Sequence, residues 1–313
     1  MKHLLTLNPH FKLRILITGG SGFVGNELIN ALLKSKHALC ALTRSPIQLK
    51  ISSDVVDDVN NFASILLTNN NWKVEVRDFN PNLVIHLAAY LTSNDDQQSI
   101  EKLLEANINF GTHLLDALKG TNCKLFITTG TFAEYLSNTT QLDPAYLYAA
   151  TKSAFRSILQ YYSSIIGFSV LNVIPYTIYG TMSRQKKILD RIYDALDAPV
   201  PQNMSPGEQN LDFIHIEDVI SFYLQVIEHS VVFENQKYTE IHLGTGVGTT
   251  PKQVASYFEQ FTQKKANILW GGIPYRDRDT LFSVANRNLA NNFIAWQPTI
   301  TIEEGIKRYI QST

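Results

Sequence analysis

A chain of 313 residues is long enough to bury a large hydrophobic core, and its 27 basic and 28 acidic residues leave a net charge of only −1. That balance argues against nucleic acid or an anionic membrane as a partner. The two cysteines, Cys40 and Cys123, are too few for a secreted disulfide framework. No apolar run has the length of a signal-peptide core or a membrane span. The sequence therefore predicts a soluble, cytoplasmic globular protein that binds no nucleic acid and no membrane.

The first half of the chain alternates short apolar runs with longer segments of helical periodicity, which is the pattern of parallel βαβ units. Strands are expected at residues 13–18, 38–43, 82–88, 124–129 and 168–174. The strand that follows 38–43 is ambiguous, because either 48–53 or 72–76 could supply it. Helices are expected at 23–36, 99–119 and 146–166.

After residue 176 the rhythm loosens into loops that contain proline and glycine. A strand is expected at 237–243, and helices are expected near 183–197, 216–228, 250–264 and 302–311. We predict an α/β protein with a Rossmann-like, doubly wound parallel sheet and a smaller α/β C-terminal portion. Residues 1–176 are expected to bind a dinucleotide and residues 177–313 the substrate, with some interleaving of the chain and a cleft between the two portions.

A glycine-rich turn follows the first predicted strand. The stretch TGGSGFVG at residues 18–25 spaces Gly19, Gly22 and Gly25 three residues apart and leads into a helix. Glycine permits the tight turn, lets the backbone approach phosphate oxygens and allows the helix to pack close to the strand. The helix N-terminus adds unpaired N–H groups and a partial positive charge. The turn therefore indicates a pyrophosphate site, the alternative being a glycine turn without a ligand.

The end of the second strand indicates which dinucleotide fits. An acidic side chain there would accept hydrogen bonds from the ribose 2′-hydroxyl, but the chain has Thr43 and Arg44 instead. A guanidinium suits a 2′-phosphate, so Arg44 favours NADP(H) over NAD(H). The alternative is a solvated loop arginine. Asp54 would lie near the adenine if 48–53 formed the next strand.

Tyr148 and Lys152 are four residues apart, which places both side chains on one face of a helix. A nearby ammonium favours the phenolate and lowers the pKa of the tyrosine, which could then exchange a proton with a carbonyl or an alcohol. The spacing alone is weak evidence in a chain with 14 tyrosines. Its place after a strand that ends in Thr128 and Thr129 gives it weight, because ligands of such sheets bind beyond the carboxyl ends of the strands.

Other polar and aromatic residues of this region are expected to be structural. Tyr146, Tyr161 and Tyr162 have no lysine four residues further on, and His86 lies within an apolar strand. The eight histidines show no pairing with cysteine or carboxylate at metal-ligand spacing, so no metal site is expected.

These motifs together resemble the extended short-chain dehydrogenase/reductase family, whose members act on nucleotide sugars. The resemblance rests on TGGSGFVG at 18–25, HLAA at 86–89, Asn107, ITT at 127–129, YAATK at 148–152 and PYTIYG at 175–180. It implies that Tyr148 is the catalytic acid/base, that Lys152 steadies its ionisation and binds the nicotinamide ribose, and that Thr129 bonds the substrate oxygen. Thr131 takes the role of Thr129 if the register of GTFAEY differs. The residues implied to bind the cofactor are Gly19, Gly22, Phe23, Val24, Gly25, Arg44, Leu87, Ala88, Ala89, Asn107, Tyr148, Lys152 and Pro175.

Three C-terminal segments resemble a narrower group, the CDP-abequose and CDP-paratose synthases, which reduce a 4-keto-deoxysugar with NADPH. The segments are 204–219, 237–246 and 281–298. Related enzymes carry a nucleotide-binding arginine where this chain has Leu211. A second diphosphate-binding arginine is assigned to Arg276, with Arg278 close by, and the alternative for both is a solvated loop.

The resemblance implies NADPH-dependent reduction of the 4-keto group of a CDP- or dTDP-linked deoxyhexose. The alternatives are an NAD-dependent 4-epimerase or dehydratase that keeps NAD(H) bound and, further off, a non-catalytic dinucleotide-binding regulator. The helices at 99–119 and 146–166 resemble those that pair two subunits in the family, which implies a homodimer.

Overall fold

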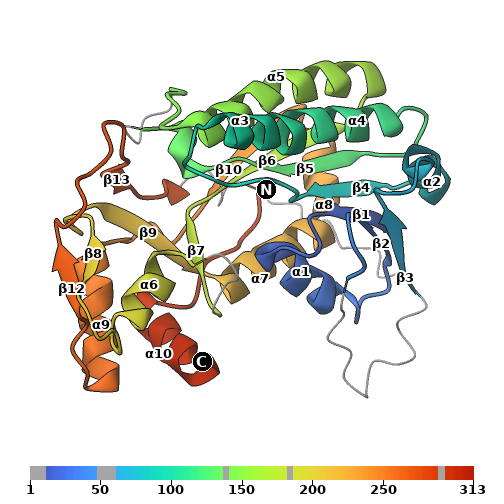
Figure 1. Cartoon of the computed structure of the whole chain (residues 1–313). Coiled ribbons are helices and arrows are strands. Elements are labelled where there is room, and N and C mark those ends of the chain that lie inside the picture. The colour runs from blue at the N-terminus through green and yellow to red at the C-terminus, as the bar shows by residue number, and fades with distance from the viewer. Residues whose placement is uncertain (1–11, 48–60, 137–140, 182–185, 288–292) are drawn as a thin grey trace.

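The computed structural model describes residues 12–47, 61–136, 141–181, 186–287 and 293–313. The strands of its main sheet are β1 (Arg14–Thr18), β2 (Ala38–Thr43), β3 (Phe62–Leu66), β4 (Leu83–His86), β5 (Leu125–Thr129), β6 (Ser169–Pro175) and β10 (Tyr238–Leu243). These seven strands are parallel and follow the order β10-β6-β5-β4-β1-β2-β3 (Figure 1). The order reverses between β1 and β4, which is the switch point where open α/β sheets bind ligands.

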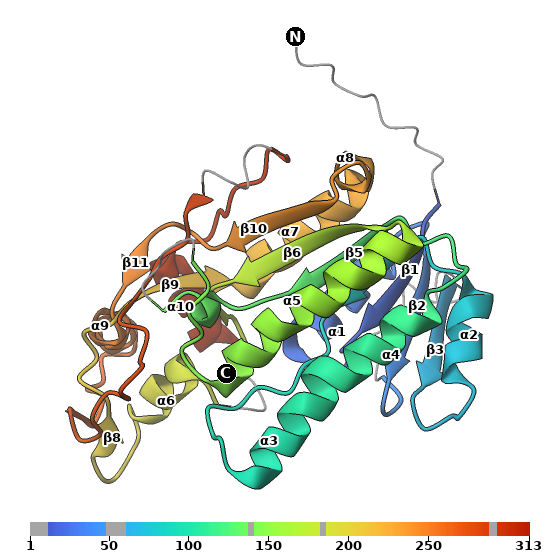
Figure 2. The same ribbon diagram turned by 90° about the horizontal axis from the view of Figure 1, so that it is seen from above.

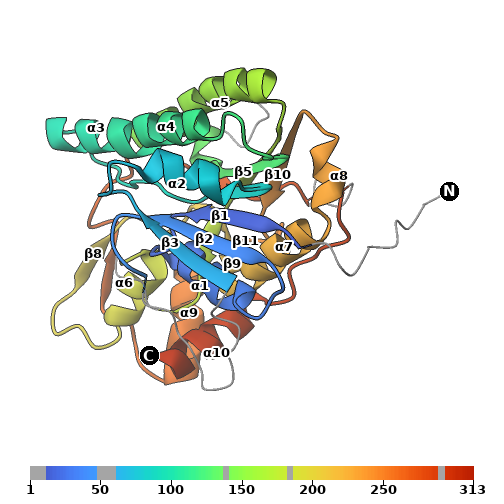
Figure 3. The ribbon, with the colours of Figure 1, turned by 90° about the vertical axis from the view of Figure 1, so that its right-hand side faces the viewer.

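Helices cover both faces of the sheet, as Figure 3 shows. On one face lie α1 (Phe23–Leu32), α7 (Ile216–Glu228) and α8 (Ser230–Glu234); on the other lie α2 (Trp72–Phe79), α3 (Gln97–Leu104), the π-helical turn η3 (Glu105–Asn109), α4 (Phe110–Ala117) and α5 (Leu147–Ile166). Ile15 and Ile17 pack in the core beneath α1 and α7, whereas Leu16 packs in the core beneath α4 and α5. Because both faces are covered, the inner strands read as continuous apolar runs. The predicted α/β fold is confirmed.

The strand beside β2 differs from both segments that the sequence offered. It is β3, whose five residues include four apolar ones, although only Ile65 is buried along this edge strand. The predicted strand at 72–76 is wrong, because Trp72 begins helix α2. Its alternating pattern also fits a helix: Val76 packs in the core while Val74 is 50% exposed. The other candidate, 48–53, lies outside the described residues, as does Asp54.

The predicted helix at 99–119 is confirmed as a helical run composed of α3, η3 and α4. The outer surfaces of α3 and α5 expose Ile100, Leu104, Tyr161 and Ile165. Pairing of two copies through these helices stays a prediction. In the part of the chain that the structure describes, no helix has both the length and the apolar character needed to cross a membrane.

A smaller assembly lies at the carboxyl ends of the main strands (Figures 1 and 2). Its elements are β7 (Thr177–Tyr179), α6 (Ile188–Asp194), β8 (Gln202–Met204), β9 (Asn210–His215), β11 (Gly248–Thr249), α9 (Pro251–Thr262), β12 (Ile268–Trp270), β13 (Phe282–Ser283) and α10 (Ile302–Ser312). Strand β9 pairs with β7, β11 and β13, and β8 pairs with β12. Phe213, Phe258 and Tyr309 are central to a separate core beneath α9 and α10.

The two parts of the molecule share the chain. After β7, α6 and β9, the chain returns to the main sheet as α7, α8 and β10, and β10 pairs with β6 over its full length. The predicted strand at 237–243 is thus confirmed, and it belongs to the large sheet. After β10 the chain leaves the main sheet again and forms β11 and α9.

Asp212 on β9 binds the two chain segments that follow β10 and β13. Its carboxylate is fully buried and accepts hydrogen bonds from the backbone N–H groups of Thr245 (2.8 Å), Gly246 (2.8 Å) and Ala285 (3.1 Å). We expect Asp212→Ala to lower the free energy of unfolding by about 3 kcal/mol or more, because several buried donors lose a charged acceptor. Denaturant unfolding measures this loss. Asp197→Ala is the control, because Asp197 pairs with Lys264 at the surface and should cost less than about 1 kcal/mol; equal losses would contradict the assignment.

Candidate active site

The glycine-rich turn is wound tightly between β1 and α1. Gly19 has a left-handed φ of +71°, and a Cβ atom on it would lie 2.6 Å from the backbone nitrogen of Ala88. The N–H of Gly22 donates to the carbonyl of Gly19 (2.9 Å), and a side chain at Gly25 would overlap that same carbonyl. The turn therefore brings its backbone, the N-terminus of α1 and the segment after β4 into close contact, which only glycine permits.

Thr18 and His86 join the two central strand ends. The Thr18 hydroxyl lies 2.8 Å from His86 Nδ1 and accepts a hydrogen bond from the N–H of Ala88 (3.2 Å). His86 is buried beside Phe110 and Phe155, and burial, together with the Lys152 ammonium, lowers its pKa to about 3. His86 is therefore neutral at physiological pH and acts as a structural link between the strands.

A cavity of about 470 Å³ opens beside this turn. Of the residues predicted to bind the cofactor, six line it: Gly19, Gly22, Arg44, Leu87, Ala88 and Ala89. Trp72, Tyr90, Glu105 and Phe110 also line it, and the sequence did not indicate them. Arg44 is exposed and follows the end of β2. On either side of it, the hydroxyl of Thr43 and the backbone of Ser45 form hydrogen bonds with each other. A cavity of this size with a glycine cradle, a helix N-terminus and a cation fits a dinucleotide.

The other predicted cofactor residues, Tyr148 and Lys152 among them, are not part of this lining. Asn107 is buried in η3, where it accepts from the N–H of Tyr90 (2.9 Å) and donates to the carbonyl of Tyr90 (3.1 Å) and to Thr151 (3.0 Å). It therefore holds the wall of the cavity. Phe23 and Val24 open helix α1, and Pro175 ends β6.

Tyr148 and Lys152 lie in the first two turns of α5. Both side chains are buried, and Lys152 Nζ lies 5.9 Å from the centroid of the Tyr148 ring. Burial raises the pKa of Tyr148, and the nearby Tyr146 and Glu134 raise it further. Burial lowers the pKa of Lys152 to about 8, against the opposing effect of Glu134.

The sequence led us to expect that Lys152 lowers the pKa of Tyr148, and in this structure the pKa is raised. The physical reason is desolvation, because a buried phenolate loses the water that would stabilise its charge. At neutral pH the phenol is therefore protonated and is able to donate a proton.

The two candidate hydroxyls follow β5. Thr129 ends the strand, and its hydroxyl donates a long hydrogen bond to the carbonyl of His86 (3.5 Å). Thr131 is buried and caps the short 3₁₀ helix η4 (Phe132–Glu134), where its oxygen accepts from the N–H of Ala133 (3.3 Å). A capping hydroxyl still has its own proton to donate. Thr129 thus lies at the carboxyl end of the strand beside β4, and Thr131 lies two residues beyond it.

The arginine-containing loop approaches the start of α5. Arg278 forms an ion pair with Asp143 and donates to the carbonyl of Pro144 (3.2 Å), just before α5. Arg276 is exposed, and its charge acts on Tyr146, the residue that caps the helix. Leu211 packs in the core of the smaller assembly.

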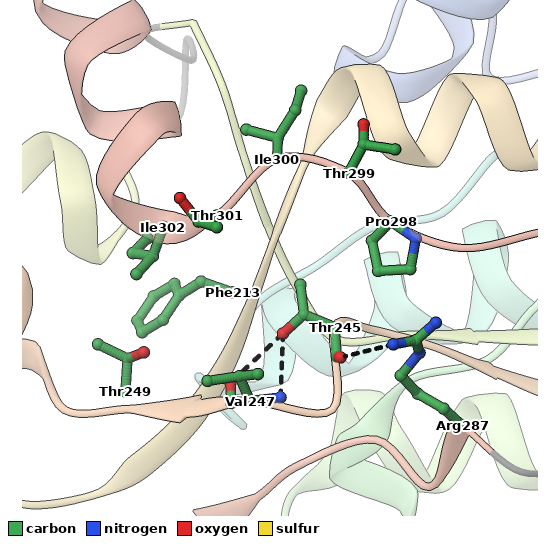
Figure 4. Close-up of a pocket in the computed structure, with 10 residues that line it drawn as sticks. All are labelled: Phe213, Thr245, Val247, Thr249, Arg287, Pro298, Thr299, Ile300, Thr301 and Ile302. Carbon is green, nitrogen blue, oxygen red and sulfur yellow. Dashed lines mark hydrogen bonds between the residues drawn. The ribbon is translucent and has the colours of Figure 1, made fainter.

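A second cavity of about 250 Å³ lies in the smaller assembly (Figure 4). Phe213 and four threonines line it, and Arg287 is the charged residue of its lining, with Nη1 3.5 Å from the carbonyl of Thr245. The residues predicted for catalysis are not part of this lining. They do not line the cavity beside the glycine turn either, but six of the residues predicted to bind the cofactor do, which makes that cavity the stronger candidate for the cofactor.

Comparisons with known proteins show the family of the chain. A family model described as the NAD dependent epimerase/dehydratase family matches residues 15–241. CDP-abequose synthase of Salmonella typhimurium is 28% identical over 304 residues, which cover 95% of this chain and 97% of that protein. UDP-glucuronate 4-epimerase of Thermodesulfobacterium geofontis is 24% identical and covers 94% of both chains.

Among solved structures, the UDP-glucuronic acid 4-epimerase of Bacillus cereus in complex with UDP-glucuronic acid and NAD is similar to this chain. It superimposes with a TM-score of 0.81 at 20% identity, over 95% of this chain and 98% of that one. This similarity shows a shared fold.

Proposed function

Because the chain belongs to the NAD dependent epimerase/dehydratase family, we propose that this enzyme uses NADPH to reduce the 4-keto group of a CDP- or dTDP-linked deoxyhexose. The observation that carries the proposal is the buried, protonated phenol of Tyr148 beside Lys152, at the end of the sheet where the glycine turn lies. The similarity to CDP-abequose synthases supports the choice of a sugar reductase.

The protein supplies orientation and proton transfer in this scheme. When bound, NADPH provides the hydride that C4 of the sugar receives. Tyr148 donates its proton to the C4 oxygen, which becomes a hydroxyl group. Thr129 shares a hydrogen bond with the same oxygen, and Thr131 is the alternative donor. Lys152 steadies the tyrosine and holds the nicotinamide ribose.

The substrate diphosphate is assigned to the loop that carries Arg276. Its charge acts on Tyr146, two residues before Tyr148, so an anion bound by Arg276 would lie near the N-terminus of α5. Arg278 is held by Asp143 and orders the same loop. A guanidinium suits a diphosphate because it donates two parallel hydrogen bonds.

The proposal is tested with a panel of 4-ketosugars linked to CDP, dTDP, GDP or UDP. Purified enzyme is mixed with NADPH and each sugar, and loss of the reduced nicotinamide absorbance is followed. We expect consumption with a CDP- or dTDP-linked sugar. Stoichiometric NAD(H) in the purified protein, with no consumption of added NADPH, would instead support the 4-epimerase or dehydratase that the similarity to UDP-glucuronate 4-epimerase favours.

The preference for NADPH is assigned to Arg44. We expect Arg44→Ala to weaken NADPH binding by about 10-fold or more and to leave NADH binding unchanged, because the lost contact is a charged hydrogen bond to the 2′-phosphate. Quenching of protein fluorescence measures both affinities. Arg77→Ala is the control, since Arg77 is exposed on α2 and does not line the cavity. Equal losses for both dinucleotides would contradict the assignment.

A further inference from the structure

A fully buried carboxylate lies next to the candidate catalytic pair. Glu134, on η4, accepts a hydrogen bond from the backbone N–H of Thr131 (2.8 Å) at one oxygen. Its other oxygen accepts from the hydroxyl of Ser153 (2.9 Å) and from Nε of Arg156 (2.8 Å), both on α5. One side chain thus joins the turn after β5 to the helix that carries Tyr148.

The turn after β5 is shaped around this carboxylate. A Cβ atom on Gly130 would lie 2.5 Å from Glu134 Oε1 and would also overlap the side chain of Ile174. Glu134 and Ile174 together therefore require a glycine between Thr129 and Thr131. Gly130 and Glu134 thus fit each other: the turn that carries the hydroxyls of Thr129 and Thr131 packs directly against the Glu134 carboxylate.

The face of α5 that carries Tyr148 and Lys152 continues with Arg156, one helical turn further on. Arg156 lies between two carboxylates, with Nε bound to Glu134 and Nη1 2.6 Å from Glu240 on β10. Its side chain is 13% exposed, that of Glu240 is 21% exposed and that of Glu134 is fully buried. The pair nearer to Tyr148 is thus the better shielded from water, where electrostatic effects are strongest.

We propose that Glu134 is a positioning residue of the reaction, which fixes the turn of Thr129 and Thr131 against α5 and supplies negative charge beside the Tyr148–Lys152 pair. The rate effects rest on the proposed function, in which Tyr148 donates a proton. The effect on the charge state of Lys152 does not depend on any substrate.

The sign of the charge effect follows from the groups that surround the pair. Glu134 from η4 raises the pKa values of both Tyr148 and Lys152, Tyr146 also raises that of Tyr148, and His86 from β4 is neutral. Removing the charge of Glu134 should lower both pKa values. Since the reduction needs a protonated phenol, activity should then decline at a lower pH.

Two variants separate the effect of the Glu134 charge from the effect of its side-chain length. Glu134→Gln keeps the length of the side chain and removes its charge, whereas Glu134→Asp keeps the charge and shortens the side chain. In Glu134→Gln we expect the pKa of Lys152 to fall by about 1 unit, and the alkaline limb of kcat to move down by ~1 pH unit. In Glu134→Asp we expect neither shift but a fall in kcat of about 10-fold, because the hydroxyl-bearing turn is displaced.

The pKa of Lys152 is followed by its ¹³Cε NMR shift in lysine-labelled protein, assigned with Lys152→Arg, and needs no sugar. Glu240→Gln is the matched control, because it also removes one carboxylate charge from Arg156, whereas Glu240 bonds the hydroxyl of Tyr135 and not the backbone of Thr131. We expect the pKa of Lys152 and the pH profile of kcat to stay unchanged in this variant. An unchanged Lys152 pKa in Glu134→Gln, or an equal fall in Glu240→Gln, would overturn the inference.

If no 4-ketosugar is reduced while the Lys152 shift is seen, the proposed reaction fails and the electrostatic role of Glu134 stands. If Glu134→Gln does not fold, Glu134→Asp decides, since an unchanged kcat there would exclude positioning.

Discussion

Tyr148→Phe should lower turnover by about 100-fold or more while leaving NADPH affinity nearly unchanged. The substitution removes only the hydroxyl, so the buried ring still packs beside Lys152 and the cavity at the glycine turn is untouched. A 100-fold loss corresponds to about 2.7 kcal/mol of transition-state stabilisation, which is in the range of a lost general acid. Steady-state rates with the accepted 4-ketosugar and an NADPH binding titration measure the two quantities.

Tyr162→Phe is the matched control for this experiment. Tyr162 lies on the same helix, and Lys119 Nζ lies 5.4 Å from its ring, so it also has a lysine beside a phenol. It lies 14 residues beyond Tyr148, near the other end of α5. We expect turnover to stay at the parental level. Equal turnover of Tyr148→Phe and the parent enzyme would remove Tyr148 from the mechanism.

Gly19→Ala should weaken dinucleotide binding by about 100-fold. The alanine must adopt a φ of +71° and place its Cβ 2.6 Å from the backbone nitrogen of Ala88. The left-handed conformation costs roughly 1 kcal/mol and the overlap roughly 2 kcal/mol, which together correspond to about 100-fold in affinity if the cavity wall shifts to relieve them. Fluorescence titration with NADPH measures the loss.

Gly120→Ala isolates the cost of the backbone conformation alone. Gly120 has a similar φ of +79°, and a Cβ atom there would meet nothing within 4 Å. We expect about 1 kcal/mol of lost stability and no change in NADPH affinity. If Gly19→Ala bound NADPH as tightly as Gly120→Ala does, the glycine turn would not be the dinucleotide site.

The sequence predicted those parts of the fold in which local pattern and tertiary environment agree. Strand β2 was predicted with its observed limits, 38–43, because the sheet buries nearly all of it. Strand β3 was not predicted although four of its five residues are apolar, and the strand at 72–76 was wrong because its alternating pattern also fits a helix. The limit was the ambiguity of short apolar patterns.

In the candidate site, too, the residues that depend on local sequence pattern were predicted, and those that depend on the tertiary environment were not. The glycine spacing and the pair of Tyr148 and Lys152 were visible because their chemistry depends on residues close in sequence. Glu134 was not singled out, since its partners Ser153 and Arg156 become neighbours only when η4 packs on α5. The arginine four residues after Lys152 was the one signal that could have pointed to a buried acid. The raised pKa of Tyr148 could not be predicted either, because burial is a property of the whole fold.

The return of the chain to β10 determines how the molecule can be divided. Cutting after residue 176 would leave β6 with an open edge, and its unpaired N–H and C=O groups would offer a template for another chain. The helices α7 and α8, which shield the opposite face, would be lost with it. Residues 1–176 therefore cannot be exchanged as one contiguous unit: replacing the smaller assembly requires grafting the two segments 177–215 and 244–313 while α7, α8 and β10 between them stay in place.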